Sequence, residues 1–420
     1  MMPILKLAAK SLMNRWATAA LTLFTIAIST GLLLGVERLR TEARISFSNT
    51  ISGADLIVGA RSGAVQLLLY SVFRIGNATN NITMESYDKL KKSKAIAWTI
   101  PISLGDSHKG YRVLGTNGDY FRHYRYGRKQ KLAFRAGKPF SDLFDVVLGA
   151  EVARALNYKL GDRIVIAHGL GRAGLTKHDA TPFAVSGILA PTGTPVDRTV
   201  HVSLEAIEAI HVDWKSGAKM PGRTTPADAI RRMDLRPHQI TAFIIGLKSK
   251  LAVFRQQRRI NNFNEEPLLA ILPGVTLLEL WGLMGTAEKA LLAISWLVVA
   301  SGILGMLAVI LSGLNERRRE MAILRSVGAR PAHLAGLMTA EAGVLTLAGV
   351  VAGIALHYLA IAVARPFIRA EFGIDLPFGL LTSYHWALLG AIFAAGLLIG
   401  LIPAWRAYRY TVSDGLIVRT

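Results

Sequence analysis

Seven histidines give the middle of this 420-residue chain a capacity for metal chemistry, because histidine is the commonest metal ligand in proteins. None of them falls in an i,i+4 helical pair or a His-x-His strand pair, the spacings that place two imidazoles on one face. The sequence therefore predicts scattered surface histidines and no metal site, with a low-affinity metal site as the alternative. The seven are His108, His123, His168, His178, His201, His211 and His238.

Catalytic and nucleotide-binding motifs are missing from the sequence. There is no G-x-x-x-x-G-K-[ST] phosphate loop, no G-x-S-x-G, no H-E-x-x-H and no paired-carboxylate motif. Cysteine is absent, which excludes disulfides, thiolate metal sites and a thiol nucleophile. The glycine-rich stretch 169–174 has no amphipathic helix after it and is interpreted as a surface turn. The sequence predicts a chain that is not an enzyme and holds no cofactor.

Glu341 is a carboxylate inside an apolar run, seven residues after the run begins at Leu334. A charge at membrane depth costs about 3 kcal/mol and suggests a functional role, such as a proton relay or an interhelical partner. At 1.5 Å per residue, however, Glu341 lies only about 10 Å from the start of the run. We therefore favour an interpretation in which it snorkels toward the interface or pairs with an arginine of the preceding loop.

The most informative segment is ERRREMAILRSVGA, residues 316–329. Over Glu316–Val327 its spacing predicts a short amphipathic helix, with Met321, Leu324 and Val327 on one stripe and charges on the other. Gly328 is placed to end this helix, since glycine readily adopts the left-handed conformation at a helix C-terminus. Such a helix between two membrane spans either lies at the interface or docks into a groove of another protein.

Four apolar runs, uncharged except for Glu341, position these residues, and each is long enough to cross a bilayer, which needs about 17–25 residues. Because backbone in hydrocarbon must satisfy its own hydrogen bonds, the runs are predicted to be helices. A cleaved signal peptide is the rival interpretation of the first run. That run exceeds about 15 residues and no small-residue cleavage site follows it, which favours an uncleaved anchor. The predicted spans are 17–36, 290–313, 334–364 and 386–402.

Charge in the short loops sets the orientation. The loop 314–333 carries five arginines against two glutamates, whereas residues 366–385 of the next loop (365–385) have one arginine against one glutamate and one aspartate. Positively charged loops stay in the cytoplasm, which places the loop 314–333, the amphipathic N-terminal segment 1–16 and the tail 403–420 there. Region 37–288 is then a large extracytoplasmic domain inserted between the first and second spans.

Small residues recur four apart in the spans, which allows helices to approach closely. We interpret them as helix-packing positions and as a candidate basis for oligomerisation. The pairs are Gly31/Gly35, Gly349/Gly353 and Gly396/Gly400, with Ser301/Gly305 in the second span.

The extracytoplasmic region is basic. It holds 35 Lys and Arg against 22 Asp and Glu, a net charge of +13, within a chain of net charge +21. Such a balance suits an acidic partner or an anionic membrane face, and a solvated basic surface explains it equally well. Because long apolar runs accompany the charge, membrane lipids and not nucleic acid are the expected partner of the chain as a whole.

Strand and helix patterns alternate unevenly over residues 37–288, which predicts an α+β domain with mixed sheets and not a doubly wound one. We expect a turn at Gly105–Asp106 between strands 98–104 and 110–115, and one continuous helix from 279–288 into the second span. The clearest unit is a strand-helix-strand over 145–168. The other predicted strands are 54–59, 183–189, 199–203, 239–247 and 268–272; the helices are 83–94, 204–210 and 250–261; 214–225 is a loop.

Several of these segments resemble one known family. Residues 316–329, followed by the glycine-rich run that bears Glu341, closely resemble the FtsX-like permease domain of ABC transporters of the MacB, LolC, LolE and FtsX type. The C-terminal GLIPAWRAYRYTVSDGL (400–416) is similar to the closing motif of that family, and residues 5–29 are similar to its N-terminal helix and first span. VVLGAEVARALNYKLGDRIVI (146–166) and FAVSGILAPTGTPVDRTVHVSLEAI (183–207) resemble its periplasmic domain.

The resemblance implies a multi-pass permease subunit in the bacterial inner membrane. It implies a separate cytoplasmic ATPase that binds ATP and Mg, a second permease copy (as a homodimer or with a paralogue), and a periplasmic or outer-membrane partner. The loop helix would dock onto the ATPase, and hydrolysis would move the periplasmic domain to act on a lipoprotein, peptide or drug, or on a partner protein. Glu341 falls where the family often has Glu, which favours a structural role. The ATPase-coupling residues carried over are Glu316, Arg317, Arg318, Arg319, Glu320, Met321, Leu324, Arg325 and Gly328.

Three other functions stay open on the residues alone. A membrane-anchored sensor or scaffold would act through the basic domain without ATP. A component of metal-associated (zinc) transport would use the histidines, and a proton-coupled carrier would use Glu341.

Overall fold

The computed structural model describes residues 13, 16–168, 182–215, 218–220, 225–316, 323–372 and 377–409, and the chain divides into two compact units. Unit 1 comprises Met1–Glu42, Gly285–Phe367 and Leu376–Thr420, and contains most of the apolar helices. Unit 2 comprises Ala43–Met284 and Ile368–Asp375, and contains the strands.

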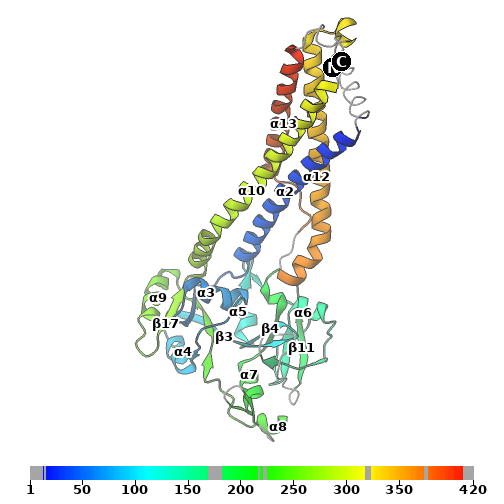
Figure 1. The fold of residues 1–420 in the computed structure, drawn as a ribbon. Coiled ribbons are helices and arrows are strands. Elements are labelled where there is room, and N and C mark those ends of the chain that lie inside the picture. The colour runs from blue at the N-terminus through cyan, green and yellow to red at the C-terminus, as the bar shows by residue number, and fades with distance from the viewer. Residues whose placement is uncertain are drawn as a thin grey trace. The chain divides into compact units, whose positions relative to one another are not determined.

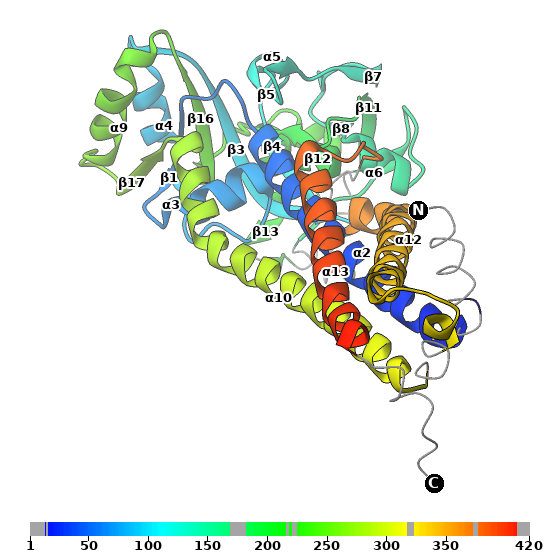
Figure 2. The same ribbon diagram turned by 90° about the horizontal axis from the view of Figure 1, so that it is seen from above.

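Unit 1 is built from long helices (Figure 2): α2 (Trp16–Asn49), α10 (Pro273–Glu316), α12 (Pro331–Phe372) and α13 (Ser383–Arg409). In the described part of the chain, four helices are long and apolar enough to cross a membrane, over Trp16–Asn49, Pro273–Ser312, Pro331–Ile368 and Ser383–Trp405. This confirms the prediction of one span before the large domain and three after it.

The helices are longer than the predicted spans. α10 has 44 residues and α12 has 42, so each exceeds 60 Å at about 1.5 Å per residue, twice the ~30 Å of a hydrocarbon core. An apolar run predicts only the part of a helix that lies in hydrocarbon. The helix itself continues beyond that run until its hydrogen bonding is interrupted. The predicted continuity of 279–288 with the second span is confirmed, and the helix begins earlier, at Pro273, since proline is tolerated in a first helical turn.

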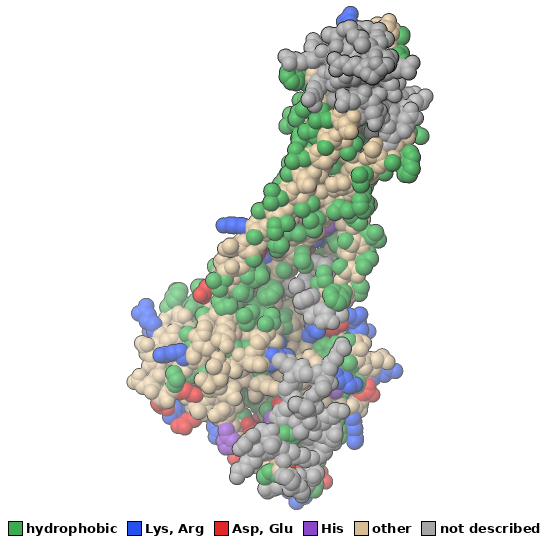
Figure 3. Space-filling model, viewed as in Figure 1, with side chains coloured by type: hydrophobic (Ala, Val, Ile, Leu, Met, Phe, Trp, Pro, Cys, Tyr) green, Lys and Arg blue, Asp and Glu red, His purple; other side chains and the backbone are tan. Residues whose placement is uncertain are grey.

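The core of unit 1 is an apolar cluster to which all four helices contribute, including Leu33, Ile303, Leu345 and Ile392. Large apolar side chains on the opposite faces of the helices are exposed and cover the surface of the bundle in Figure 3. A helix that is apolar on both its packed and its outer face is suited to lipid contact.

Unit 2 is organised around one 11-stranded sheet (Figure 1). The parallel pairs are β4–β12 and β8–β11, and the other pairs are antiparallel, which confirms a mixed sheet. The strands in spatial order are β17 (Leu268–Ile271), β1 (Leu56–Ala60), β16 (Ala242–Leu247), β3 (Ile96–His108), β4 (Tyr111–Thr116), β12 (Thr199–Ser203), β8 (Asp145–Leu148), β11 (Phe183–Leu189) and β7 (Phe134–Gly137), with β10 (Ala167–His168) beside β3 and β9 (Arg163–Ile164) beside β11.

Strand β3 joins the two halves of this sheet. Its first half pairs with β16 and its second half pairs with β4. The predicted turn at Gly105–Asp106 is wrong, because these residues form an irregularity within one 13-residue strand, where the register shifts. The turn lies at Lys109–Gly110, whose φ values of +47° and +86° suit a two-residue hairpin loop.

Short helices and three small two-stranded sheets complete the described part of unit 2, and three apolar clusters form its core. Both faces of β1 are buried, so Leu56 and Ile57 belong to different clusters. The helical elements are α3 (Ala64–Leu68), η1 (Leu69–Phe73), α4 (Met84–Lys91), α5 (Asp119–His123), α6 (Ala150–Ala155), η2 (Pro195–Arg198), α7 (Leu204–His211), α8 (Ala227–Ile230), η3 (Lys250–Ala252) and α9 (Val253–Asn261). The two-stranded sheets pair β2 (Ile82–Thr83) with β15 (Gln239–Ile240), β5 (Arg125–Tyr126) with β6 (Gln130–Lys131), and β13 (Trp214–Lys215) with β14 (Ala218–Lys219).

Helices α2 and α10 each continue without a break from unit 1 into unit 2. Within unit 2 their ends contact each other through aromatic rings. The Phe47 ring centroid lies 4.5 Å from that of Phe73 and 5.7 Å from that of Trp281, and the Arg44 guanidinium lies 5.7 Å above the Trp281 ring. The two helices are therefore fixed to one another where they join the sheet domain.

Candidate functional site

The Arg-rich loop ends in a helical turn that glycine terminates. Gly328 has a φ of +101°, its N–H donates to Arg325 O at 3.0 Å, and the Ala329 N–H donates to Leu324 O at 2.9 Å. These two bonds are the Schellman pattern of a helix C-terminus. The helix thus ends at Gly328, where the sequence predicts its end.

Apolar side chains of this turn divide into a packed one and an exposed pair. Leu324 packs against the cluster formed by Leu334, Leu337, Met338 and Ala404 in unit 1. Ile323 and Val327 are 53% and 83% exposed, and residues four apart share one helix face. Leu324 thus packs within the chain, and the ATPase-coupling role carried over for it stays a prediction.

The other predicted coupling residues are described only in part. Glu316 is the last residue of α10 and Arg325 is half-buried. Arg317, Arg318, Arg319, Glu320 and Met321 lie outside the described residues.

Glu341 lies on α12, ten residues after Pro331, and its side chain is only 4% exposed. A snorkelling carboxylate would extend to water, so the structure corrects that half of the interpretation. Its next neighbour Ala342 belongs to the core of unit 1. Glu341 is therefore part of the packed interior of the helix bundle.

Five of the six predicted helix-packing glycines contact another helix of the same chain. A Cβ on Gly349 would lie 2.6 Å from Ile26 of α2, and one on Gly353 would lie 2.6 Å from Thr30 of α2. The glycines thus bring α12 close to α2 and α13 within one chain. Gly35 makes no such contact, because a Cβ there would have no atom of another helix within 4 Å. In the remaining three cases, a Cβ on Gly31 would lie 3.3 Å from Gly353 O, one on Gly396 would lie 2.3 Å from Thr346 Oγ1, and one on Gly400 would lie 2.5 Å from Ala342 Cβ.

Substituting Gly353 with alanine is expected to destabilise unit 1 by about 1–3 kcal/mol, the usual effect of overpacking. The added methyl would meet Thr30 and also the backbone oxygen of Ala27, at 2.9 Å, which cannot turn away. Gly35→Ala is the matched control and should be neutral or up to about 1 kcal/mol stabilising, from helix propensity alone. Thermal unfolding of the purified chain in detergent, followed by tryptophan fluorescence, measures both; equal effects would contradict the packing role.

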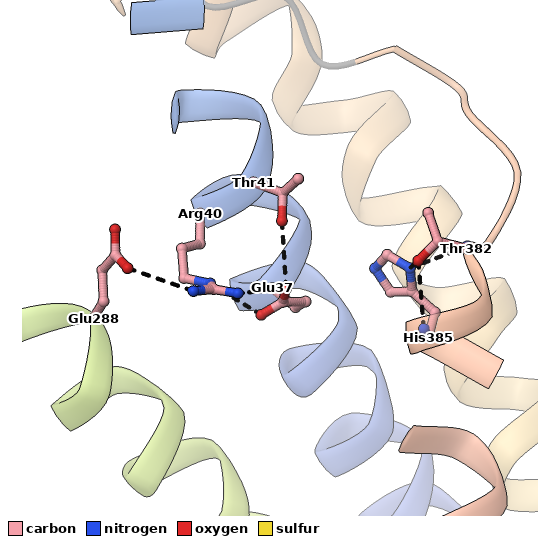
Figure 4. A network of polar contacts seen from close by, with 6 residues as sticks. All are labelled: Glu37, Arg40, Thr41, Glu288, Thr382 and His385. Atoms are coloured by element: carbon pink, nitrogen blue, oxygen red, sulfur yellow. Dashed lines mark hydrogen bonds and ion pairs between the residues drawn. The ribbon is translucent and has the colours of Figure 1, made fainter. Parts of the chain in front are cut away.

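A network of polar and charged side chains connects α2 and α10 within unit 1 (Figure 4). Glu37 of α2 is 3% exposed and accepts hydrogen bonds from Arg40 at 2.8 and 3.1 Å and from Thr41 at 3.3 Å. Arg40 also reaches across to α10, where its Nη1 lies 3.4 Å from Glu288 Oε2. A buried carboxylate needs such a cation, because an unpaired charge in a low-dielectric interior is costly. Arg40 therefore ties α2 to α10.

The neighbouring Arg38 ties α2 to the segment before α13. Its side chain is 7% exposed, its Nη2 donates to Pro377 O at 2.9 Å, and its Nε lies 3.2 Å from Glu42 Oε1. A Cβ on Gly379 would lie 2.4 Å from Arg38 Nη2, so this arginine needs a glycine beside it. The sequence shows charges at these positions but does not indicate their partners.

Helices α12 and α13 begin with the same capping device. The Arg330 N–H donates to His333 Nδ1, and the Thr382 N–H donates to His385 Nδ1, each at 3.2 Å. Here histidine takes the place of the Glu or Gln of a capping box, three residues after the N-cap. These histidines therefore have a structural role in the described conformation.

Two histidines of unit 2 are buried in its core, which corrects the prediction that all seven lie on the surface. His201 is fully buried, donates from Nδ1 to Val147 O at 3.2 Å, and lies against Tyr120 with ring centroids 5.2 Å apart. Burial, reinforced by the nearby Arg74 charge, lowers the pKa of His201 to about 3. His108 donates to Val165 O at 2.6 Å, and burial also lowers its pKa.

In the described residues, no three His, Asp or Glu side chains come together in a way that could hold a metal ion. His178 lies outside the described residues. The zinc-transport alternative therefore gains no support from the described part of the chain.

His201 predicts an acid-sensitive fold. Since its pKa is about 3 when folded and 6.5 when unfolded, the unfolded chain binds the extra proton between these values, and stability falls as the pH drops below 6.5. The expected loss is about 1.4 kcal/mol per pH unit. His201→Phe should flatten the dependence of the unfolding midpoint between pH 7.5 and 5, whereas His238→Phe, at an exposed position, should not. An unchanged slope in the His201 variant would contradict this assignment.

The two stretches that resemble a periplasmic domain contact each other in the sheet. Gly149, after β8, has no room for a side chain, because a Cβ there would lie 2.3 Å from Val196 O. Asp197 accepts hydrogen bonds from the backbone N–H groups of Thr192 and Gly193, both at 2.8 Å, and so shapes the loop that contacts Gly149. These motif residues therefore serve folding of the domain.

Helix layout and inserted domain together define a multi-pass membrane protein with one span before and three after an α+β domain. Two family models match the chain: "MacB-like periplasmic core domain" over residues 19–230, half of the chain, and "FtsX-like permease C-terminal" over residues 292–412. The chain belongs to the MacB/FtsX-type ABC transporter permease family. It is accordingly a multi-pass protein of the inner membrane with a periplasmic domain.

Similar curated proteins are named macrolide export ATP-binding/permease protein MacB. One, from Nitrobacter winogradskyi, is 36% identical over 128 residues, which is 30% of this chain and 18% of that protein. Another, from an Azoarcus species, is 24% identical over 238 residues, 54% of this chain and 32% of that protein. The chain thus matches about a third or less of the length of these relatives.

Among solved structures, the periplasmic region of MacB from Actinobacillus actinomycetemcomitans is similar, with 12% identity over 55% of this chain and 94% of that one, and a TM-score of 0.34. The extracellular domain of the noncanonic ABC-type transporter YknZ from Gram-positive bacteria has 11% identity over 51% of this chain and 98% of that one, with a TM-score of 0.31.

Proposed function

We propose that this chain is a permease subunit that works with a separate cytoplasmic ATPase, which binds ATP and Mg, and that it transmits the movement caused by ATP hydrolysis to its periplasmic domain. One observation carries the proposal: α2 and α10 run unbroken from the membrane bundle into the domain and are joined in both units. In unit 1 Arg40 connects α2 to Glu288 of α10, and in unit 2 Phe47 of α2 contacts Trp281 of α10. A continuous helix passes a displacement along its axis with little loss, whereas a loop would absorb it.

The turn at the end of the Arg-rich loop is the proposed input of this movement. Ile323 and Val327 offer two adjacent exposed apolar side chains, and the loop around them is rich in charge. A short apolar helix face in a groove, with charges that steer the encounter, is a common docking mode. No phosphate-binding loop occurs within these 420 residues, so ATP binding is assigned to residues outside them.

The assembly that we propose contains two permease copies, identical or paralogous, and two ATPases. Its substrate is periplasmic or derived from the membrane, such as a lipoprotein, a peptide or a drug, or else it acts on a periplasmic partner. The names of the curated relatives, which are export proteins, support the general class.

Reconstitution with a candidate ATPase tests the proposal. Each ABC ATPase of the host that lacks a permease domain is co-expressed with this chain, purified and placed in proteoliposomes, and ATP hydrolysis is measured with and without the permease. The proposal predicts one stable complex whose hydrolysis rate depends on the permease. No complex with any such ATPase, together with full function in cells that lack them all, would favour the sensor or scaffold alternative.

A further inference from the structure

We propose that the outer face of α9 and its two flanking turns is a docking surface for an acidic segment of a periplasmic protein. This α9 face is defined by two exposed apolar side chains, Leu251 and Phe254, and by seven cations around them. The cations come from three neighbouring segments and are Lys92, Lys94, Lys248, Lys250, Arg255, Arg258 and Arg259. The inference is independent of ATP coupling.

The apolar side chains are unusually open for a soluble domain. Leu251 is 93% exposed and Phe254 is 61% exposed. They stand three apart, across the junction of η3 and α9, so their side chains lie on the same face. The opposite face of α9 is anchored by Gln256 and Ile260, which are buried. An exposed leucine alone needs no explanation, but an aromatic-aliphatic pair ringed by cations is typical of an interaction site.

The cations of the α9 face have no carboxylate partners within the described part of the chain. All seven side chains are exposed, and the ion pairs of the neighbourhood are made by other residues, such as Lys89 with Glu265. Arg259 donates only to the Ser93 hydroxyl, at 3.3 Å. Figure 3 shows Lys and Arg side chains beside apolar ones at the edge of unit 2 where Figure 1 places α9. The face is therefore a local concentration of uncompensated positive charge.

The face is also held in place by the fold. Gln257 Nε2 donates to Ala270 O at 3.0 Å, and Asn261 Oδ1 accepts from the Ala270 N–H at 2.7 Å, which fixes α9 to strand β17. The Lys248 N–H donates to Ala95 O at 3.0 Å and so brings the three cationic segments together. A pre-organised surface loses little conformational entropy on binding.

An acidic protein segment fits this face better than anionic lipid does. Strand β17 leads directly into α10 at Pro273, and the uncharged part of α10 begins only at Ala290. At about 1.5 Å per residue, roughly 24 Å of helix separate β17 from that uncharged run. The uncharged run is thus well separated from β17 along the chain, and α9 belongs to unit 2, the periplasmic unit.

Site-specific photocrosslinking in the full chain, in cells, tests the proposal. The probe is p-benzoylphenylalanine at position 254, with Leu160, exposed elsewhere on unit 2, as the matched control position. We expect a crosslink to a net-negative segment of a periplasmic protein, identified by mass spectrometry. In the same background, Arg255→Glu with Arg258→Glu should reduce its yield about ten-fold or more, since like charges then face each other.

Arg128→Glu with Lys131→Glu is the matched charge control, because both residues are exposed on the β5–β6 hairpin. It changes the net charge equally and should leave the yield unchanged. Crosslinks to lipid only, a protein crosslink that both double variants reduce alike, or a yield no higher than at position 160 would each overturn the proposal. Equal thermal unfolding midpoints for the two double variants exclude misfolding as the cause.

Discussion

Ile323→Asp combined with Val327→Asp is expected to abolish association with the ATPase while the permease stays folded in the membrane. Both side chains are exposed in the chain alone, so their replacement removes no internal packing. In a docked complex, each would place an unpaired carboxylate in an apolar groove. We expect an affinity loss of at least about 100-fold, or about 2.7 kcal/mol. Co-purification of the two subunits and the permease-dependent rate of ATP hydrolysis measure it.

Ser326→Asp is the control, since Ser326 is exposed on the same turn and lies between the two positions. It places one carboxylate beside the apolar pair without removing either apolar side chain, and should retain most of the binding. Leu324→Asp should instead destabilise the permease itself, because Leu324 packs against Leu334 and Leu337. A double variant that binds the ATPase as the natural chain does would contradict docking through this turn.

Arg40→Gln is expected to destabilise the helix bundle strongly. It leaves Glu37, which is 3% exposed, without its cation, and it breaks the contact from α2 to Glu288 of α10. Removing one partner of a buried ion pair costs about 3–5 kcal/mol, and the partial exposure of Arg40 places the expected loss near 3 kcal/mol. Thermal unfolding in detergent measures the loss, and we expect transport to fall more than ATP hydrolysis.

A double neutralisation separates charge from packing. Glu37→Gln with Arg40→Gln removes both charges and should recover most of the lost stability, because no buried charge is then left unpaired. Lys289→Gln, at an exposed position beside Glu288, is the control and should have no effect. If the double variant is no more stable than Arg40→Gln, an unpaired Glu37 charge is not the cause of the lost stability.

Strands and spans were predictable because their patterns are local. An uncharged run of about 20 residues is typical of a membrane-spanning helix, and a short β-branched run is typical of a buried strand. The helical stretch 64–73 was missed, because AVQLLLYSVF is apolar on almost every side and has no polar face to mark a helix. It ends at Arg74, whose φ of +61° is unusual for a residue other than glycine and leaves no sequence signal.

The candidate site was predictable in its place but not in its contacts. Helical periodicity located the amphipathic turn, yet it cannot tell which of the adjacent residues Ile323 and Leu324 faces the chain's own bundle. Arg40 and Glu288 are 248 positions apart, and no pattern within either segment indicates that they meet. The burial of His201 likewise depends on tertiary packing, because aromatic residues of α5 cover its ring.

The most direct test of the proposed mechanism is the distance between the two periplasmic domains of the complex with and without ATP. The chain has no cysteine, so Arg128→Cys, at an exposed position of unit 2, provides a single site for a spin label. Pulsed electron paramagnetic resonance on the reconstituted complex then measures the separation of the two labels. Transmission through α2 and α10 predicts that the distance distribution differs between the ATP-bound and nucleotide-free states. In the Arg40→Gln variant the two states should give the same distribution. Identical distributions in an assembly that hydrolyses ATP would contradict the account.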